Sequence, residues 1–181
     1  SRRAGLAQEH FKTADDLLKS LDTLSAQLTR LVAMQDAYVD QLLIIKQLAW
    51  QARNSAGDAQ AMLANGLAGQ KLPSEPMRIY FVNTSKADGA WEALEGVAAS
   101  LPLPQRFKDA LERAKREYFA KEFIDLRLKV MRSVAADEPT GLKAEEWTPM
   151  SVAKLASLLG VAEVALDVAN ERASVQSAAA M

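Results

Sequence analysis

The chain has 181 residues, with 22 basic and 23 acidic side chains, one histidine and no cysteine. This length is typical of one compact domain with a substantial core, which we expect to span residues 1–181. Because cysteine is absent and histidine occurs once, a disulfide scaffold, a Cys/His metal cluster and a cysteine nucleophile are excluded. The net charge of −1 gives no sign of nucleic-acid binding, and we expect neither a cofactor nor a metal.

Alanine and leucine are abundant, whereas glycine, proline and β-branched residues are sparse, which predicts an all-α fold. No stretch is apolar over the roughly 18 residues that a membrane-spanning helix needs. The chain begins at Ser1 and ends in small residues up to Met181. We interpret it as a piece of a longer protein, although removal of an initiator methionine before Ser1 is an alternative at that end.

Residues 6–34 and 37–67 are expected to form two long helices. In the first, leucines recur at alternating spacings of four and three, which predicts a core-facing stripe. The stripe consists of Leu17, Leu21, Leu24, Leu28 and Leu31, widened by Leu18 and Val32. The seam of the second helix consists of Leu42, Ile45, Ala49, Ala52, Ala56, Ala59 and Leu63. One fused helix is the alternative, but at about 90 Å it would lack a partner of matching length.

Glycine and proline after residue 66 end the second helix, and residues 75–100 follow as a short, irregular helical crossover. Gly89 and the polar residues Asn83, Thr84 and Ser85 argue against an unbroken helix there. Residues 105–136 are expected to form a third long helix and residues 149–178 a fourth. The fourth has Thr148 as its N-cap, Pro149 at its first position and Trp147 packed against Val152. Its seam consists of Val152, Leu155, Leu159, Ala162, Leu166, Ala169 and Ala173.

The four long segments have similar lengths, so we expect an up-down four-helix bundle with the crossover segment at one end. We expect no enzyme, because the chain has no glycine-rich phosphate loop and no nucleophile elbow, and its carboxylates are scattered. His10, beside Glu9, is expected to be a solvated surface residue, since a metal site in a bundle needs several such pairs on facing helices.

The middle of segment 37–67 carries the strongest candidate for binding. Trp50, Arg53 and Asn54 lie where the seam changes from large to small residues, close to the mid-helix Gly57. Arginine suits bidentate capture of a carboxylate, so these residues, with Trp91 and Trp147, are our candidate ligand site. The alternative is structural: Trp50 packs, Arg53 pairs with an acid on a neighbouring helix, and the other two tryptophans anchor packing.

The run from Asp36 to Gly57, with Asp40, Lys46, Trp50 and Arg53 at their spacings, has a familiar pattern. Later parts of the same pattern are Ala90-Trp91, Tyr118-Phe119 and Trp147-Thr148 before a long alanine-rich helix. The chain resembles the extracytoplasmic sensor regions of bacterial methyl-accepting chemotaxis receptors and related membrane sensor proteins. The resemblance implies a periplasmic bundle between two transmembrane helices that relays ligand binding through its terminal helices.

Two functions therefore compete. The first is a periplasmic domain of an inner-membrane chemotaxis receptor or sensor kinase, which binds a small molecule and dimerises in the full receptor. The second is a helical interaction or dimerisation module without a small ligand, since an uncovered heptad seam binds a partner helix.

Overall fold

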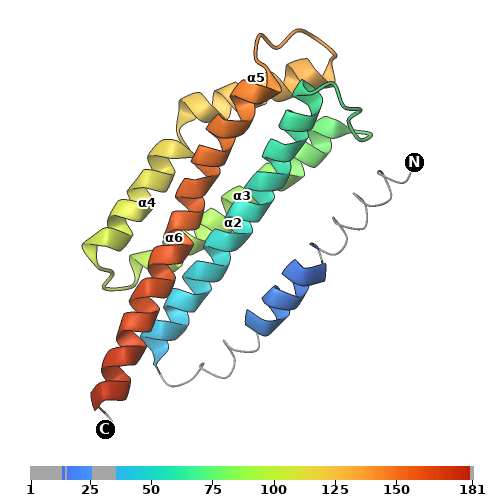
Figure 1. The fold of residues 1–181 in the computed structure, drawn as a ribbon. Helices are drawn as coiled ribbons and strands as arrows, with labels where there is room; N and C mark the ends of the chain where they lie inside the picture. Colours follow the sequence, from blue (N-terminus) through green and yellow to red (C-terminus); the bar gives the residue numbers. More distant parts are fainter. Residues whose placement is uncertain (1–13, 15, 26–35, 180–181) are drawn as a thin grey trace. The chain divides into compact units, whose positions relative to one another are not determined.

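The computed structural model describes residues 14, 16–25 and 36–179, and its regular secondary structure over these residues is entirely helical (Figure 1). The all-α class is thus confirmed. The chain divides into two compact units, Ser1–Asp40 and Gln41–Met181, which we describe separately. The single domain expected over residues 1–181 stays a prediction.

In the first unit, residues 16–25 are helical. Their leucines are exposed: Leu17 by 60%, Leu18 by 51%, Leu21 by 52% and Leu24 by 52%. Within the described residues of the first unit, therefore, no core covers these four leucines, and the core-facing stripe stays a prediction. Leu28, Leu31, Val32 and His10 lie outside the described residues, and so does the junction that would distinguish one fused helix from two.

Helix α2 (Ala37–Leu67) has the predicted bounds. All seven predicted seam residues, from Leu42 to Leu63, are fully buried. The helix ends in a Schellman motif, because Gly69 has a φ of 74° and the Gln70 N–H donates to the Asn65 carbonyl at 2.9 Å. The predicted seam of this helix and its predicted end are therefore confirmed.

The prediction of a short, irregular crossover over residues 75–100 is wrong. These residues form helix α3 (Pro76–Ala99), which is continuous over 24 residues. Its buried residues recur at helical spacing and are Tyr80, Thr84, Ala87, Trp91, Leu94 and Ala98. Ser85 and Gly89, which suggested a break, lie on the exposed face. The Thr84 hydroxyl donates to the Tyr80 carbonyl at 3.1 Å, so this buried polar residue is satisfied within the helix.

The predicted helix over residues 105–136 is wrong as one element, because the chain forms α4 (Gln105–Glu117) and α5 (Lys121–Ala135). Neither glycine nor proline marks the break, and Ala120 there has φ −58° and ψ 135°. On a straight helix, residues five apart point about 140° away from each other. The break instead brings the rings of Tyr118 and Phe123 to a centroid distance of 5.8 Å.

Helix α6 (Ala144–Ala179) begins earlier than predicted, and Pro149 lies inside it. Its start is fixed by Glu146, whose carboxylate accepts the Lys143 N–H at 3.0 Å, as in one half of a capping box. Thr148 is not the N-cap. The contact of Trp147 with Val152 is also wrong, because Trp147 is fully buried whereas Val152 is 57% exposed.

The predicted seam of α6 is correct only in part. Leu155, Ala162 and Ala169 are buried as expected. Leu166 is 40% exposed and Ala173 is also exposed, like Val152. The buried face also includes Leu158, Val161 and Ala165, so it lies rotated from the predicted one.

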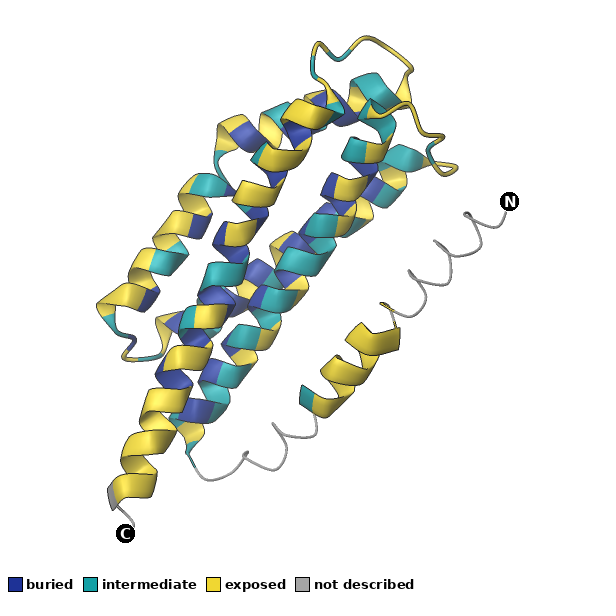
Figure 2. Cartoon of the chain, in the orientation of Figure 1, coloured by how far each residue is buried: buried dark blue, intermediate teal, exposed yellow. Residues whose placement is uncertain are grey.

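Within the second unit, α2, α3, the α4–α5 pair and α6 run in alternating directions along one axis (Figure 1). The residues expected as a crossover thus form α3, which lies along the bundle and packs against α5, while α4 packs against α6. Buried residues lie on the inward faces, and the last turns of α6 are exposed (Figure 2).

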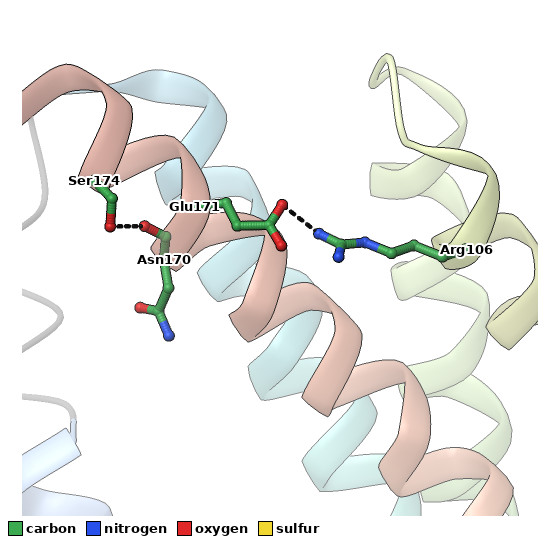
Figure 3. Close-up of polar contacts among 4 residues, drawn as sticks. All are labelled: Arg106, Asn170, Glu171 and Ser174. Atoms are coloured by element: carbon green, nitrogen blue, oxygen red, sulfur yellow. Dashed lines mark hydrogen bonds and ion pairs between the residues drawn. The ribbon is translucent and has the colours of Figure 1, made fainter. Parts of the chain in front are cut away.

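Two ion pairs connect α4 with α6. Arg106 lies 2.5 Å from Glu171, and close by the Ser174 hydroxyl donates to the Asn170 carbonyl at 2.8 Å (Figure 3). Lys154 lies 2.7 Å from Glu117 at the other end of α4. Their order shows that the two helices are antiparallel, but surface pairs of this kind add little stability.

Candidate functional site

The predicted binding residues of α2 lie at the surface of the bundle. Trp50, Arg53 and Asn54 are half-buried, and the Arg53 Nη1 donates to the Asn54 Oδ1 at 3.4 Å. In the part of the chain that the structure describes, Arg53 makes no ion pair, so the alternative of an acidic partner on a neighbouring helix has no support. Among the described residues, a Cβ at Gly57 would meet only the Arg53 Nη1, at 3.4 Å, so none of the described helices requires this glycine.

Trp91 and Trp147 lie elsewhere, in the core. Trp91 on α3 packs against Phe119 with a centroid distance of 4.9 Å, and Trp147 on α6 stacks on Phe123 at 6.0 Å. No hydrogen bond or ring contact among the described residues joins either tryptophan to Trp50, Arg53 or Asn54. The structure thus separates the five predicted residues into a surface group and a core group.

The core tryptophans are the ends of a continuous row of aromatic rings. Between them, Phe119 meets Tyr118 edge to face at 5.0 Å, and Tyr118 meets Phe123 at 5.8 Å. The row connects α3 with α6 through the α4–α5 break. Such offset and edge-to-face pairs are favourable beyond their buried area, so the break is stabilised by packing.

Arg127 of α5 lies against this row and is only 3% exposed. Its guanidinium carbon is 4.5 Å from the centroid of the Tyr118 ring and 5.5 Å from that of Phe123. Its Nε and Nη1 meet no hydrogen-bond partner, and no carboxylate in the described ranges forms an ion pair with it. Arginine keeps its proton in proteins, so a full positive charge is buried here.

Two further buried polar groups belong to the same region: Tyr118, whose ring the guanidinium faces, and Gln60, whose amide acts on the Tyr118 hydroxyl. Gln60 of α2 is 3% exposed, and neither of its amide atoms has a partner among the described residues. Burial raises the pKa of the Tyr118 hydroxyl, while the Arg127 charge and the nearby Gln60 amide lower it. The Tyr118 hydroxyl itself has no hydrogen-bond partner among the described residues.

The charge of Arg127 also acts on α3. Burial raises the pKa of Tyr80 to about 12 against an opposing effect of Arg127. Partial burial likewise raises the pKa of Asp88, and Arg127 again opposes the shift. We call Arg127, Gln60 and Tyr118 the arginine cluster. It combines a positive charge with several free donors in an apolar interior, which can bind an anion but offers no nucleophile and no catalytic base.

The sequence does indicate two residues of this cluster, because Arg127 and Gln60 each lie at helical spacing from buried apolar residues. Arg127 lies four residues after Phe123 and three before Val130, which are both apolar and buried. Gln60 likewise follows Ala56 by one turn on the seam of α2. A charged or amide side chain at a core position is expensive to bury, and that spacing alone marks both residues.

A cavity of about 460 Å³ lies at one end of the second unit, between the end of α2, the loop before α3 and the end of α5. Its lining includes Gly66, Lys71, Glu75 and Asp137, and none of the predicted site residues. No group of three potential metal ligands occurs in the described parts of the chain. In the same residues, no helix has both the length and the apolar character needed to cross a membrane.

No protein-family model matches the chain, and no curated protein and no solved structure is significantly similar to it.

Proposed function

We propose that the chain is the ligand-sensing part of a transmembrane signalling receptor, either a chemotaxis receptor or a sensor kinase. In this proposal the bundle lies in the periplasm, is attached to the inner membrane through flanking transmembrane helices and dimerises in the full receptor. The chain itself has no catalytic activity. The resemblance of residues 36–57 to chemotaxis-receptor sensor regions supports this proposal.

One structural observation supports it most strongly: the Arg127 guanidinium is buried inside the bundle, and its Nε and Nη1 have no hydrogen-bond partner among the described residues. Such a group raises the free energy of the empty protein and is typical of a site that a ligand completes. Phe123, one turn before Arg127, stacks on Trp147 of α6. A ligand at the arginine cluster would therefore bias the position of α6, which we propose as the output helix.

A thermal-shift screen tests the proposal, because a ligand that binds only the folded state raises its melting temperature. The purified chain is screened against small acids, amines, sugars and aromatic compounds. We expect at least one class to raise the melting temperature in a concentration-dependent way. The absence of any such compound would refute the sensor function.

The screen also locates the site. Arg53→Ala removes the predicted surface group, whereas Arg127→Met removes the buried charge and leaves a side chain of similar length. Loss of binding in Arg127→Met alone assigns the ligand to the core. Loss in Arg53→Ala alone would return it to Trp50, Arg53 and Asn54.

A second function, a helical dimerisation module without a small ligand, rests on the exposed leucines at 17, 18, 21 and 24. Heptad-spaced leucines on one face favour a partner helix. Light scattering distinguishes it: a monomer that stays monomeric at high concentration argues against this module, and a dimer lost on Leu21→Glu supports it.

A further inference from the structure

We propose that the arginine cluster binds the carboxylate of a small organic monoanion. This inference rests on the proposed ligand-sensing function and names the class of ligand. It is carried by the unpartnered polar atoms of three buried side chains from α2, the α4–α5 break and α5, namely Gln60, Tyr118 and Arg127.

The charge of the cluster selects an anion. Among the residues described, Arg127 has no ion-pair partner, although Asp88 is near enough for Arg127 to lower its pKa. A buried lysine could lose its proton, but arginine cannot, so neutralisation has to come from a negatively charged group. One guanidinium balances one negative charge. A dianion such as inorganic phosphate would leave a charge unbalanced in the same apolar surroundings.

The unpartnered donors and acceptors of the arginine cluster favour a carboxylate as the ligand group. The unpartnered atoms are Arg127 Nε and Nη1, both amide atoms of Gln60 and the Tyr118 hydroxyl. The hydroxyl of Tyr118 is protonated at neutral pH, as tyrosines ordinarily are, and burial favours this form further, so it can donate. Donors therefore outnumber acceptors, and the complement of these donors is a group with two acceptor oxygens. A carboxylate has this form, whereas an amide does not.

The aromatic surroundings favour an organic anion. The guanidinium faces Tyr118 and Phe123, and Phe123 is in turn stacked on Trp147. A hydrated inorganic ion gains nothing from these rings. A carboxylate with an apolar or aromatic body gains from burial beside them, as in most small-molecule sites.

The test measures binding by calorimetry and by melting shift with the whole chain. The probes are sodium propanoate and sodium benzoate, their amides, and inorganic phosphate and chloride at matched ionic strength. We expect the carboxylates to bind wild type, with the amides and inorganic anions weaker by about tenfold or more. Arg127→Met should weaken carboxylate binding by about tenfold or more, Gln60→Leu by less, and Arg53→Ala not at all.

A second readout does not depend on the variants folding. A bound carboxylate neutralises Arg127, so it should raise the pKa of Asp88, which Arg127 now lowers. NMR titration of the Asp88 carboxyl with and without benzoate measures this. An unchanged pKa under saturating benzoate would overturn the proposed site.

The possible results separate the two proposals. If amines or sugars bind and no carboxylate does, the ligand class is wrong while sensing stands. If no compound of any class binds, both fail. Binding of benzoate that is equally tight in Arg127→Met refutes the arginine cluster and leaves the ligand class in place. Tighter binding of phosphate or chloride than of benzoate refutes the organic carboxylate.

Discussion

Two helix ends in the second unit share one backbone geometry but differ in the residue that adopts it. Gly69 after α2 has a φ of 74°, and Asp137 after α5 has a φ of 56°. In both, the N–H of the following residue completes a Schellman motif. The Gln70 N–H donates to the Asn65 carbonyl at 2.9 Å, and the Glu138 N–H donates to the Ser133 carbonyl at 2.8 Å. Glycine adopts this left-handed conformation without steric cost, whereas aspartate does not.

The two positions therefore respond in opposite directions to substitution. Gly69→Ala should lower the free energy of unfolding by about 1 kcal/mol, because a Cβ is strained at this φ. Asp137→Gly should raise it by a few tenths to about 1 kcal/mol. Urea denaturation measures both. Equal shifts of the same sign would show that these caps do not have the described geometry.

The buried tyrosines make stability depend on pH at the alkaline end. Burial raises the pKa of Tyr80 from 10.0 to about 12, and it also raises the pKa of Tyr118. An acid whose pKa is raised by folding stabilises the folded state below the unfolded pKa, and this stability is lost as pH rises through the folded pKa. We therefore expect the folded chain to lose stability between pH 10 and pH 12.

Ultraviolet titration of tyrosinate tests this expectation. Tyr80→Phe should remove a late-titrating component, with a midpoint of about 12, from the folded protein. Titration of that residue near its ordinary pKa of 10.0 would contradict the burial described here.

At the scale of single helices, periodicity predicted α2 well and α6 poorly. All of the α2 seam is buried because its helix keeps one face inward throughout its length. Val152 and Leu166 of α6 are apolar yet exposed, so hydrophobicity alone could not identify the inward face there. Ser85 and Gly89 misled the prediction for α3 because their exposed positions were not visible in composition.

The predicted start of α6 at Thr148 is wrong because two capping signals compete within six residues, and the helix begins at Ala144. Thr148 and Pro149 form the stronger sequence pattern, but Glu146 binds the Lys143 N–H and the full burial of Trp147 fixes the earlier start. Glu146→Ala should therefore cost about 0.5–1 kcal/mol of unfolding free energy. Thr148→Ala, the matched control, should change it by less than about 0.5 kcal/mol.

These two variants distinguish the helix starts by chemical denaturation. A larger loss for Thr148→Ala than for Glu146→Ala would support the start that the sequence suggested. The break between α4 and α5 had no comparable signal, since it results from tertiary packing of Tyr118, Phe119 and Phe123.

At the scale of the whole molecule, the fold class followed from composition, but the candidate site did not. The prediction chose Trp50 and Arg53 because aromatic and guanidinium groups lay side by side in the sequence. The structure leaves them half-buried and instead brings Gln60 of α2 to Tyr118 and Arg127, which lie more than 50 residues later in the chain. No local pattern spans such separations, so only the tertiary fold reveals this grouping.

The proposed mechanism requires the empty bundle to be less stable than it could be. Its second unit already has a large apolar core, and the arginine cluster adds to that core a charge that forms no ion pair with any described residue. Such a feature persists in proteins when function requires it, at a cost in stability. Ligand binding would then recover the lost stability and bias α6 through Phe123 and Trp147.

The most direct test of this account is the unfolding free energy of ligand-free Arg127→Met, compared with wild type and with Arg53→Met as the control. Replacing an uncompensated buried charge by an apolar side chain of similar length should stabilise the chain by about 1–4 kcal/mol. The half-buried control should change by less than about 0.5 kcal/mol. A clear loss of stability in Arg127→Met would contradict the account, because it would make the guanidinium a structural element of the core and not a site kept for a ligand.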